Sequence, residues 1–108
     1  MTTLLATLRN FERLYAGGFR DRVTDSALLK VAISQITRDE TALRDIDRDL
    51  AEFEQQYQMS SEAFYHRWQA GELGDEADFM DWNALYQMAC QVRERLNLLR
   101  ETSTPYEY

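Results

Sequence analysis

A segment of about 33 residues, from Ser26 to about Gln58, contains neither glycine nor proline, and it constrains the fold more than any other feature. Its apolar residues recur at alternating spacings of three and four, which is typical of a helix with one apolar seam. The seam consists of Leu29, Ala32, Ile36, Leu43, Ile46, Leu50, Phe53 and Tyr57 and is interrupted once, by Asp39. Thr24 or Asp25 can cap the start of the helix. The helix would be roughly 50 Å long, so other helices must cover its seam.

A second long helix is predicted from about Glu76 to Arg100, where apolar residues again recur at spacings of three and four. Its seam consists of Trp82, Leu85, Ala89, Val92, Leu96 and Leu99. Asp75 is a candidate for its N-cap, and Asp78 would lie in the first turn, where negative charge is favoured.

Two shorter helices complete the expected set. The first covers about 3–15 and ends at the glycines of a loop expected over 17–24. Its apolar face consists of Leu4, Leu8, Phe11 and Leu14 or Tyr15. The second covers about 61–70, with Ser60 as its N-cap and Gly71 at its C-terminal end.

These helices predict an all-α fold, a long antiparallel helical hairpin with a short elbow helix and an N-terminal helix. Four glycines and one proline provide few of the turns that an all-β fold needs. We expect a single helical domain over 1–101 and a flexible C-terminal tail over 102–108. Because so thin a slab of helices leaves much apolar area exposed, a homodimer that completes a bundle is also predicted.

The charged residues are distributed unevenly. Residues 1–38 carry six basic and three acidic side chains, residues 39–81 carry three basic and thirteen acidic, and residues 82–108 carry three of each. The acidic middle argues against nucleic acid as a partner and favours a small basic protein. No apolar run approaches the roughly 20 residues that span a bilayer, and the first residues lack the pattern of a secretory leader. We therefore expect no membrane association and a cytoplasmic location.

A cluster of carboxylates before and within the start of the last helix is a candidate partner-binding surface. It consists of Glu72, Asp75, Glu76, Asp78 and Asp81. The alternative is that these residues cap the helix and oppose its dipole. A calcium site is not indicated, because the ligand spacing and central glycine of an EF-hand are missing.

Aromatic residues gather in the same region. Trp68 and Trp82 are candidate anchors for a partner, since tryptophan is enriched at the energetic centres of interfaces. The alternative is an aromatic core at the elbow, formed with Phe64, Tyr65, Phe79 and Tyr86.

Catalytic and metal-binding constellations are not indicated. His66 lies one helical turn after Glu62, but a single histidine cannot supply the paired ligands of a di-iron bundle. Cys90 has no histidine nearby in sequence to activate it and is interpreted as a small, partly buried core residue. We expect no catalytic, cofactor-binding or metal-binding residue, no cofactor and no enzymatic activity.

The run from Phe53 to Trp82 resembles a family of short prokaryotic all-helical proteins. These proteins carry a phrase F-E-x-x-Y-x-M-S-S-E-x-F-Y with G-E-L-G-D-x-x-D-F-x-x-W downstream, and both occur in this run. Many members resemble antitoxin components encoded beside small toxin genes. The resemblance implies binding rather than catalysis. No helix-turn-helix is evident in the chain, so DNA-binding autoregulation is not predicted.

Taken together, the residues and the resemblance predict a non-catalytic protein-interaction module of the antitoxin kind. Its acidic face would bind a small basic protein. The alternative is a homo-oligomeric structural or adaptor protein, with coiled-coil seams and no toxin partner.

Overall fold

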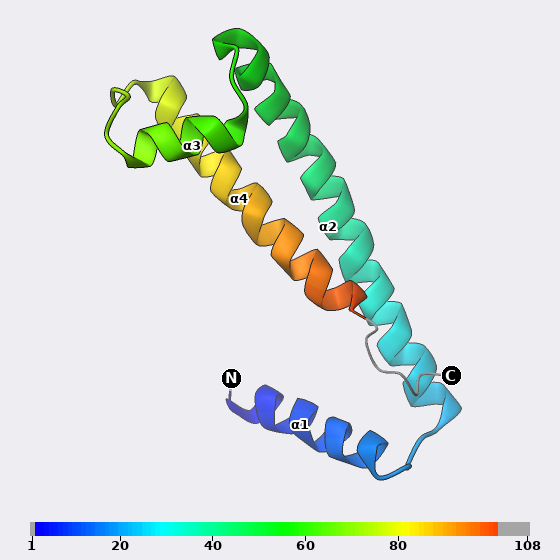
Figure 1. Ribbon diagram of the computed structural model, residues 1–108. Helices are drawn as coiled ribbons and strands as arrows, with labels where there is room; N and C mark the ends of the chain where they lie inside the picture. The colour runs from blue at the N-terminus through cyan, green and yellow to red at the C-terminus, as the bar shows by residue number, and fades with distance from the viewer. Residues whose placement is uncertain (1, 102–108) are drawn as a thin grey trace. The chain divides into compact units, whose positions relative to one another are not determined.

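The computed structural model describes residues 2–101, with side chains from Thr3 onward, and the predicted tail over 102–108 lies outside them. Four helices follow one another along the chain, and the described residues include no strand. They are α1 (Thr2–Ala16), α2 (Arg22–Tyr57), α3 (Ser61–Gln69) and α4 (Ala77–Arg100), as Figure 1 shows. The all-α prediction is confirmed. No helix among the described residues has both the length and the apolar character needed to cross a membrane.

Contacts within the chain group into two compact units, residues 1–34 and residues 35–108. The boundary falls inside α2, which is one continuous helix. The prediction of a single domain over 1–101 therefore stays a prediction. We refer to the two parts as unit 1 and unit 2.

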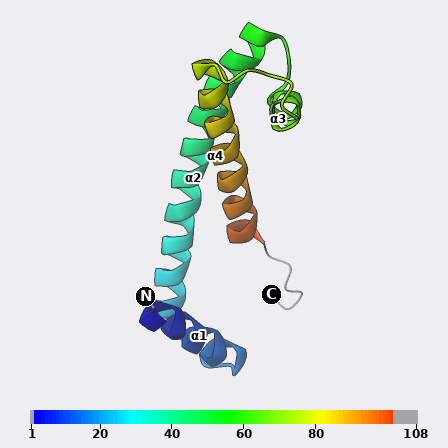
Figure 2. The ribbon, with the colours of Figure 1, turned by 90° about the vertical axis from the view of Figure 1, so that its left-hand side faces the viewer.

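Unit 2 contains an antiparallel hairpin of α2 and α4, which lie side by side in both views (Figure 1 and Figure 2). The buried core consists of Ile46, Leu50, Phe64, Trp82, Ala89, Val92 and Leu96. Leu43, Phe53 and Leu85 are partly buried against it, and Leu99 is also partly buried. The predicted seams of the two long helices thus pack together over this part of the chain.

Asp39, which interrupts the seam, is buried and ion-paired with α4. Only 3% of its surface is exposed. Arg95 Nη2 and Nε donate hydrogen bonds to its two carboxylate oxygens, at 2.6 and 2.9 Å. The hydrogen bonds from Arg95 hold the pKa of Asp39 below its ordinary value. The interruption of the seam is therefore a polar cross-link between α2 and α4. Two further ion pairs, Arg93 with Asp47 and Arg100 with Glu40, connect the same two helices.

Unit 1 comprises α1, a short connection and the first part of α2. The connection covers 17–21, so the predicted loop over 17–24 is too long. Gly18 adopts a φ of 90°, which favours glycine and ends α1 as predicted. Thr24 donates its backbone N–H and its hydroxyl to the Asp21 carboxylate, at 2.8 and 2.7 Å. Asp21 therefore caps α2, and the prediction of Thr24 or Asp25 as cap is wrong.

Asp25 instead joins the two helices of unit 1. Its carboxylate accepts a hydrogen bond from the Tyr15 hydroxyl at 2.7 Å and pairs with Arg20 at 3.3 Å. No side chain of residues 3–34 is buried, and Leu29, the first residue of the predicted seam, is 63% exposed. The seam of α2 is thus covered in unit 2 but open in unit 1.

The elbow helix α3 begins and ends as predicted. Ser60 has extended backbone angles, and its hydroxyl accepts a hydrogen bond from the Ala63 N–H at 3.1 Å. Gly71 has a φ of 75° just after the helix ends. For α4 the predicted cap is wrong: Glu76, not Asp75, is the N-cap, and its side chain makes no capping hydrogen bond within the described chain.

Candidate partner-binding site

Trp82 forms the centre of an aromatic core at the elbow. Its side chain is fully buried and stacks on Phe64, with ring centroids 4.0 Å apart and planes inclined by 4°. Phe53 and Tyr57 of α2 stack on it as well, at 5.5 and 5.6 Å. The indole Nε1 donates a hydrogen bond to the Ser61 hydroxyl at 2.8 Å. The prediction of Trp82 as an anchor for a partner is therefore wrong, because its side chain has no exposed surface to offer.

Trp68 also belongs to this core. It is partly buried and stacks on Phe64 at 6.3 Å. Tyr65 and Tyr86 pack together at 4.9 Å beside it in the same region of α3 and α4. The alternative interpretation of the aromatic residues, a core at the elbow, matches the packing.

Two members of the predicted acidic cluster are held by neighbours. Glu72 accepts a hydrogen bond from Arg67 Nε at 3.3 Å, which joins the end of α3 to the loop after it. Asp78 accepts a hydrogen bond from the Tyr57 hydroxyl at 2.6 Å. That hydrogen bond, with burial and the carboxylate charges of Asp78 and Glu76, raises the pKa of Tyr57 to about 12. Both carboxylates therefore have partners within the chain, although the Arg67–Glu72 pair is exposed on both sides and weak.

The other three members, Asp75, Glu76 and Asp81, are exposed. None of them provides a capping hydrogen bond that the structure records for α4. Asp75 and Glu76 lie in the connection before the helix, whereas Asp81 lies on α4 itself. The predicted cluster is thus divided, and Asp81 belongs to a different surface.

That surface is an open groove between α2 and α4, with a volume of about 560 Å³. We call it the acidic groove, and its lining consists of Asp49, Glu52, Phe53, Gln56, Asp81, Ala84 and Leu85. Among the described residues that line it, three are carboxylates and none is basic. The apolar side chains of Phe53 and Leu85 both belong to the region packed against the core. The groove therefore combines negative charge with an apolar surface.

Stacking orients one of the side chains that line the groove, Phe53 of α2. Phe53 stacks on the buried Trp82 with ring planes inclined by only 13°. Asp49 is 3.7 Å from Arg48 Nε, but Arg48 is 65% exposed and also pairs with Asp45. An ion pair this exposed is weak, so Asp49 can exchange Arg48 for another cation at little cost.

Asp49 and Glu52 are not among the site residues that the sequence pattern predicts. They lie three apart on α2, directly beside the seam residue Phe53, and Gln56 follows one turn later. A row of polar residues flanking an apolar seam is a signal for a surface beside a helix–helix contact. What the sequence cannot show is that Asp81 of α4 would face the same groove.

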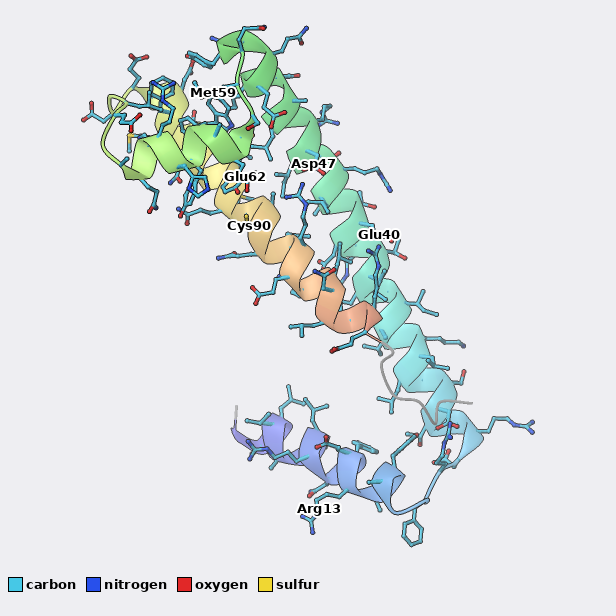
Figure 3. The ribbon with its side chains drawn as sticks, viewed as in Figure 1. Arg13, Glu40, Asp47, Met59, Glu62 and Cys90 are labelled. Atoms are coloured by element: carbon cyan, nitrogen blue, oxygen red, sulfur yellow. The ribbon has the colours of Figure 1, made fainter. Side chains whose placement is uncertain are left out.

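The remaining candidates lie apart from the groove. His66 and Glu62 are exposed on α3, and Cys90 is an exposed free thiol on α4; Figure 3 labels Glu62 and Cys90. The interpretation of Cys90 as a partly buried core residue is wrong, because it lies one position after the buried Ala89 and faces outward. Burial, followed by interaction with Cys90, raises the pKa of the neighbouring Tyr86. Within residues 2–101, no group of three or more His, Cys, Asp or Glu side chains is placed to hold a metal ion.

No family model, curated protein or solved structure matches the chain. The resemblance to antitoxin components drawn from the run between Phe53 and Trp82 therefore stays a prediction. Any assignment of function depends on the geometry and charge of the chain itself.

Proposed function

We propose that this chain is a non-catalytic interaction module of the antitoxin kind, which binds a small basic protein through unit 2. The observation that carries the proposal is the acidic groove, where Asp49, Glu52 and Asp81 surround the apolar side chains of Phe53 and Leu85.

The groove fits an arginine or lysine side chain. The methylene stem of such a residue packs on apolar surface while its charged end remains polar, so Phe53 and Leu85 suit the stem. The carboxylates of Asp49, Glu52 and Asp81 suit the cationic end, and an arginine can bind a carboxylate through two parallel hydrogen bonds. The ring of Phe53 adds a cation–π contact.

The charge of unit 2 extends this preference over a wider surface. Residues 35–108 carry sixteen acidic and seven basic side chains. Such a surface attracts a basic protein over long range and raises its association rate. A toxin that binds nucleic acid uses basic residues for the phosphates, and an acidic module that covers those residues would block the toxin.

The experiment is co-expression of the tagged chain with a small basic protein encoded beside it in the genome. The complex is purified on the tag, and its dissociation constant is measured at low and high salt. The test variant is Asp49→Asn/Glu52→Gln/Asp81→Asn, which removes three charges and keeps the side-chain shapes. The control is Glu12→Gln/Glu94→Gln/Glu101→Gln, which removes three charges from exposed positions outside the groove.

We expect the groove variant to weaken binding by roughly 100-fold and the control by less than about 5-fold, because only charges at the contact are paired directly. Both variants should retain the helical circular dichroism of the wild type. Failure of the two proteins to form a complex, or equal loss of affinity in the two variants, would contradict the proposal.

A second candidate is a homo-oligomeric structural or adaptor protein with no toxin partner. It is favoured by the exposed apolar side chains of unit 1, of which eleven large ones are 37% to 79% exposed. The two candidates differ in the co-expression experiment: an adaptor would purify as an oligomer of itself alone.

A further inference from the structure

Unit 1 carries eleven of the fourteen large apolar side chains that are exposed among the described residues. Between positions 4 and 33, eleven large apolar side chains are 37% to 79% exposed, whereas unit 2 has three such residues among those described. If each side chain has about 125 Å² of surface and slightly more than half of it is exposed, the exposed apolar area of the eleven side chains sums to roughly 800 Å².

The area matches what a specific dimer needs. A stable protein–protein interface buries about 800 Å² on each partner. Residues 27–33 add a second indication, because they are apolar around the whole helix except for Lys30. A helix that is apolar on every side is normally buried. Leu28, Leu29, Val31 and Ile33 in this stretch are all exposed in unit 1.

The apolar stripe of α1, formed by Leu4, Leu8, Phe11 and Tyr15, can pack against the same stripe of a second copy. Leu4, Leu8, Phe11 and Tyr15 follow one another at spacings of four, three and four, which read the same in either direction. Two such helices can therefore lie antiparallel with Leu4 opposite Tyr15 and Leu8 opposite Phe11. An interface with two-fold symmetry needs only one patch, used by both copies.

The charges of unit 1 favour a second copy over other occupants. Residues 1–34 carry five basic and three acidic side chains, so two copies repel each other weakly. A helix that binds an anionic membrane surface has a strongly basic polar face. The polar face of α1 mixes Arg9 and Arg13 with Glu12, which is a weak match to such a membrane.

We infer that two copies of the chain associate through unit 1, with their α1 stripes antiparallel and the 27–33 stretches of α2 buried in the same helical bundle. The acidic groove lies in unit 2 and takes no part in the contact. The inference therefore stands whether or not the groove binds a basic protein.

The first experiment measures the mass of the full chain by sedimentation equilibrium. We expect a dimer of the 12.7 kDa chain. Leu8→Glu and Leu29→Glu should each raise the dissociation constant by roughly 100-fold or more, because each buries two charges per dimer. The control is Leu98→Glu in unit 2, since Leu98 is 66% exposed and Leu29 is 63% exposed. It should remain a dimer, as should the groove variant Asp49→Asn/Glu52→Gln/Asp81→Asn.

Circular dichroism separates dissociation from unfolding. Leu8 and Leu29 are exposed in unit 1, so the isolated chain should keep its helical signal when either is charged. If Leu8→Glu lowers the signal, Leu29→Glu on the other helix provides an independent test of the same surface.

The second experiment tests the orientation of α1. In a Cys90→Ser background, chains with Leu8→Cys are mixed with chains with Phe11→Cys and oxidised mildly. The antiparallel arrangement predicts a disulfide between the two kinds of chain and little between identical chains. A monomeric wild type would overturn the inference, because unit 1 would then be covered within one chain or not at all. A dimer that dissociates with Leu98→Glu rather than Leu8→Glu, or cross-links mainly through Leu8→Cys alone, would also overturn it.

Discussion

Replacement of Ser61 by alanine tests how the elbow helix is attached to the hairpin. The Ser61 hydroxyl accepts the hydrogen bond of the Trp82 indole, 2.8 Å away, and the two residues are 5% and 0% exposed. Without the hydroxyl, the indole N–H remains buried and unpaired, which costs about 1–3 kcal/mol. In a domain of this size the melting temperature should fall by about 4–8 °C for each kcal/mol. The control is Ser26→Ala, because Ser26 lies exposed on α2, and it should change the free energy of unfolding by less than about 0.5 kcal/mol.

The double-mutant cycle with Trp82→Phe assigns the loss to this hydrogen bond. Phenylalanine has no N–H, so in its presence the Ser61 hydroxyl no longer satisfies a buried donor. We expect Ser61→Ala/Trp82→Phe to be less destabilised than the sum of the single variants by about 1 kcal/mol. Urea unfolding followed by circular dichroism, at several protein concentrations to separate folding from association, gives all four values. Additive effects within about 0.3 kcal/mol, or an unchanged stability in Ser61→Ala, would refute the reasoning.

Three further predictions follow from the core and its polar links. Leu96→Asp should lower the free energy of unfolding by at least about 3 kcal/mol and abolish most of the helical circular dichroism, because it places a charge in the buried seam. Leu43 is only half-buried, so Leu43→Asp should lower the free energy of unfolding by less. Small and equal effects of the two substitutions would contradict the packing. The pKa of Tyr57 is raised from 10.0 to about 12, so an absorbance titration should contain a step near pH 12 that is missing in Tyr57→Phe. The contribution of Tyr57 to stability is complete below pH 10 and lost as the pH rises toward 12, and Tyr57→Phe should remove this alkaline loss. The pKa of Asp39 is lowered from 3.8, so the stability it contributes is present above about pH 4 and lost as the pH falls below it; Asp39→Asn should remove that acid step in a pH series of melting temperatures.

The helices and their seams were predictable because the information is local. Spacings of three and four place residues such as Ile46 and Leu50 on one side of α2, and the same rule places Val92 and Leu96 on α4. The end of α1 was predictable because glycine favours positive φ. The caps were less so: Asp21 and Asp25 have the same side chain, and only the backbone geometry selects between them.

Long-range partners were not predictable from the pattern. The aromatic residues near the elbow suit either a core or an exposed anchor, and the choice depends on where α3 places Phe64 relative to Trp82. The acidic groove needs Asp49 of α2 and Asp81 of α4 on one side of the hairpin, and their sequence separation hides this. Asp39 likewise reads from the sequence only as an interruption of the seam, because its partner Arg95 lies on another helix.

Asp39 shows why such an interruption has a consequence for the fold. A seam of repeated apolar residues permits α4 to pack against α2 in registers that differ by one heptad, because each register buries similar side chains. The Asp39 carboxylate lies 3% exposed in that seam, and Arg95 satisfies it with two hydrogen bonds. A shift of α4 by one heptad would leave the carboxylate buried without its partner, which is strongly unfavourable. Together with the stacking of Trp82 on Phe53, the pair therefore favours one register, and in that register Asp81 lines the same acidic groove as Asp49 and Glu52. The Asp39–Arg95 pair, with a buried carboxylate and a half-exposed guanidinium, thus contributes to the arrangement of the exposed carboxylates on which the proposed binding depends.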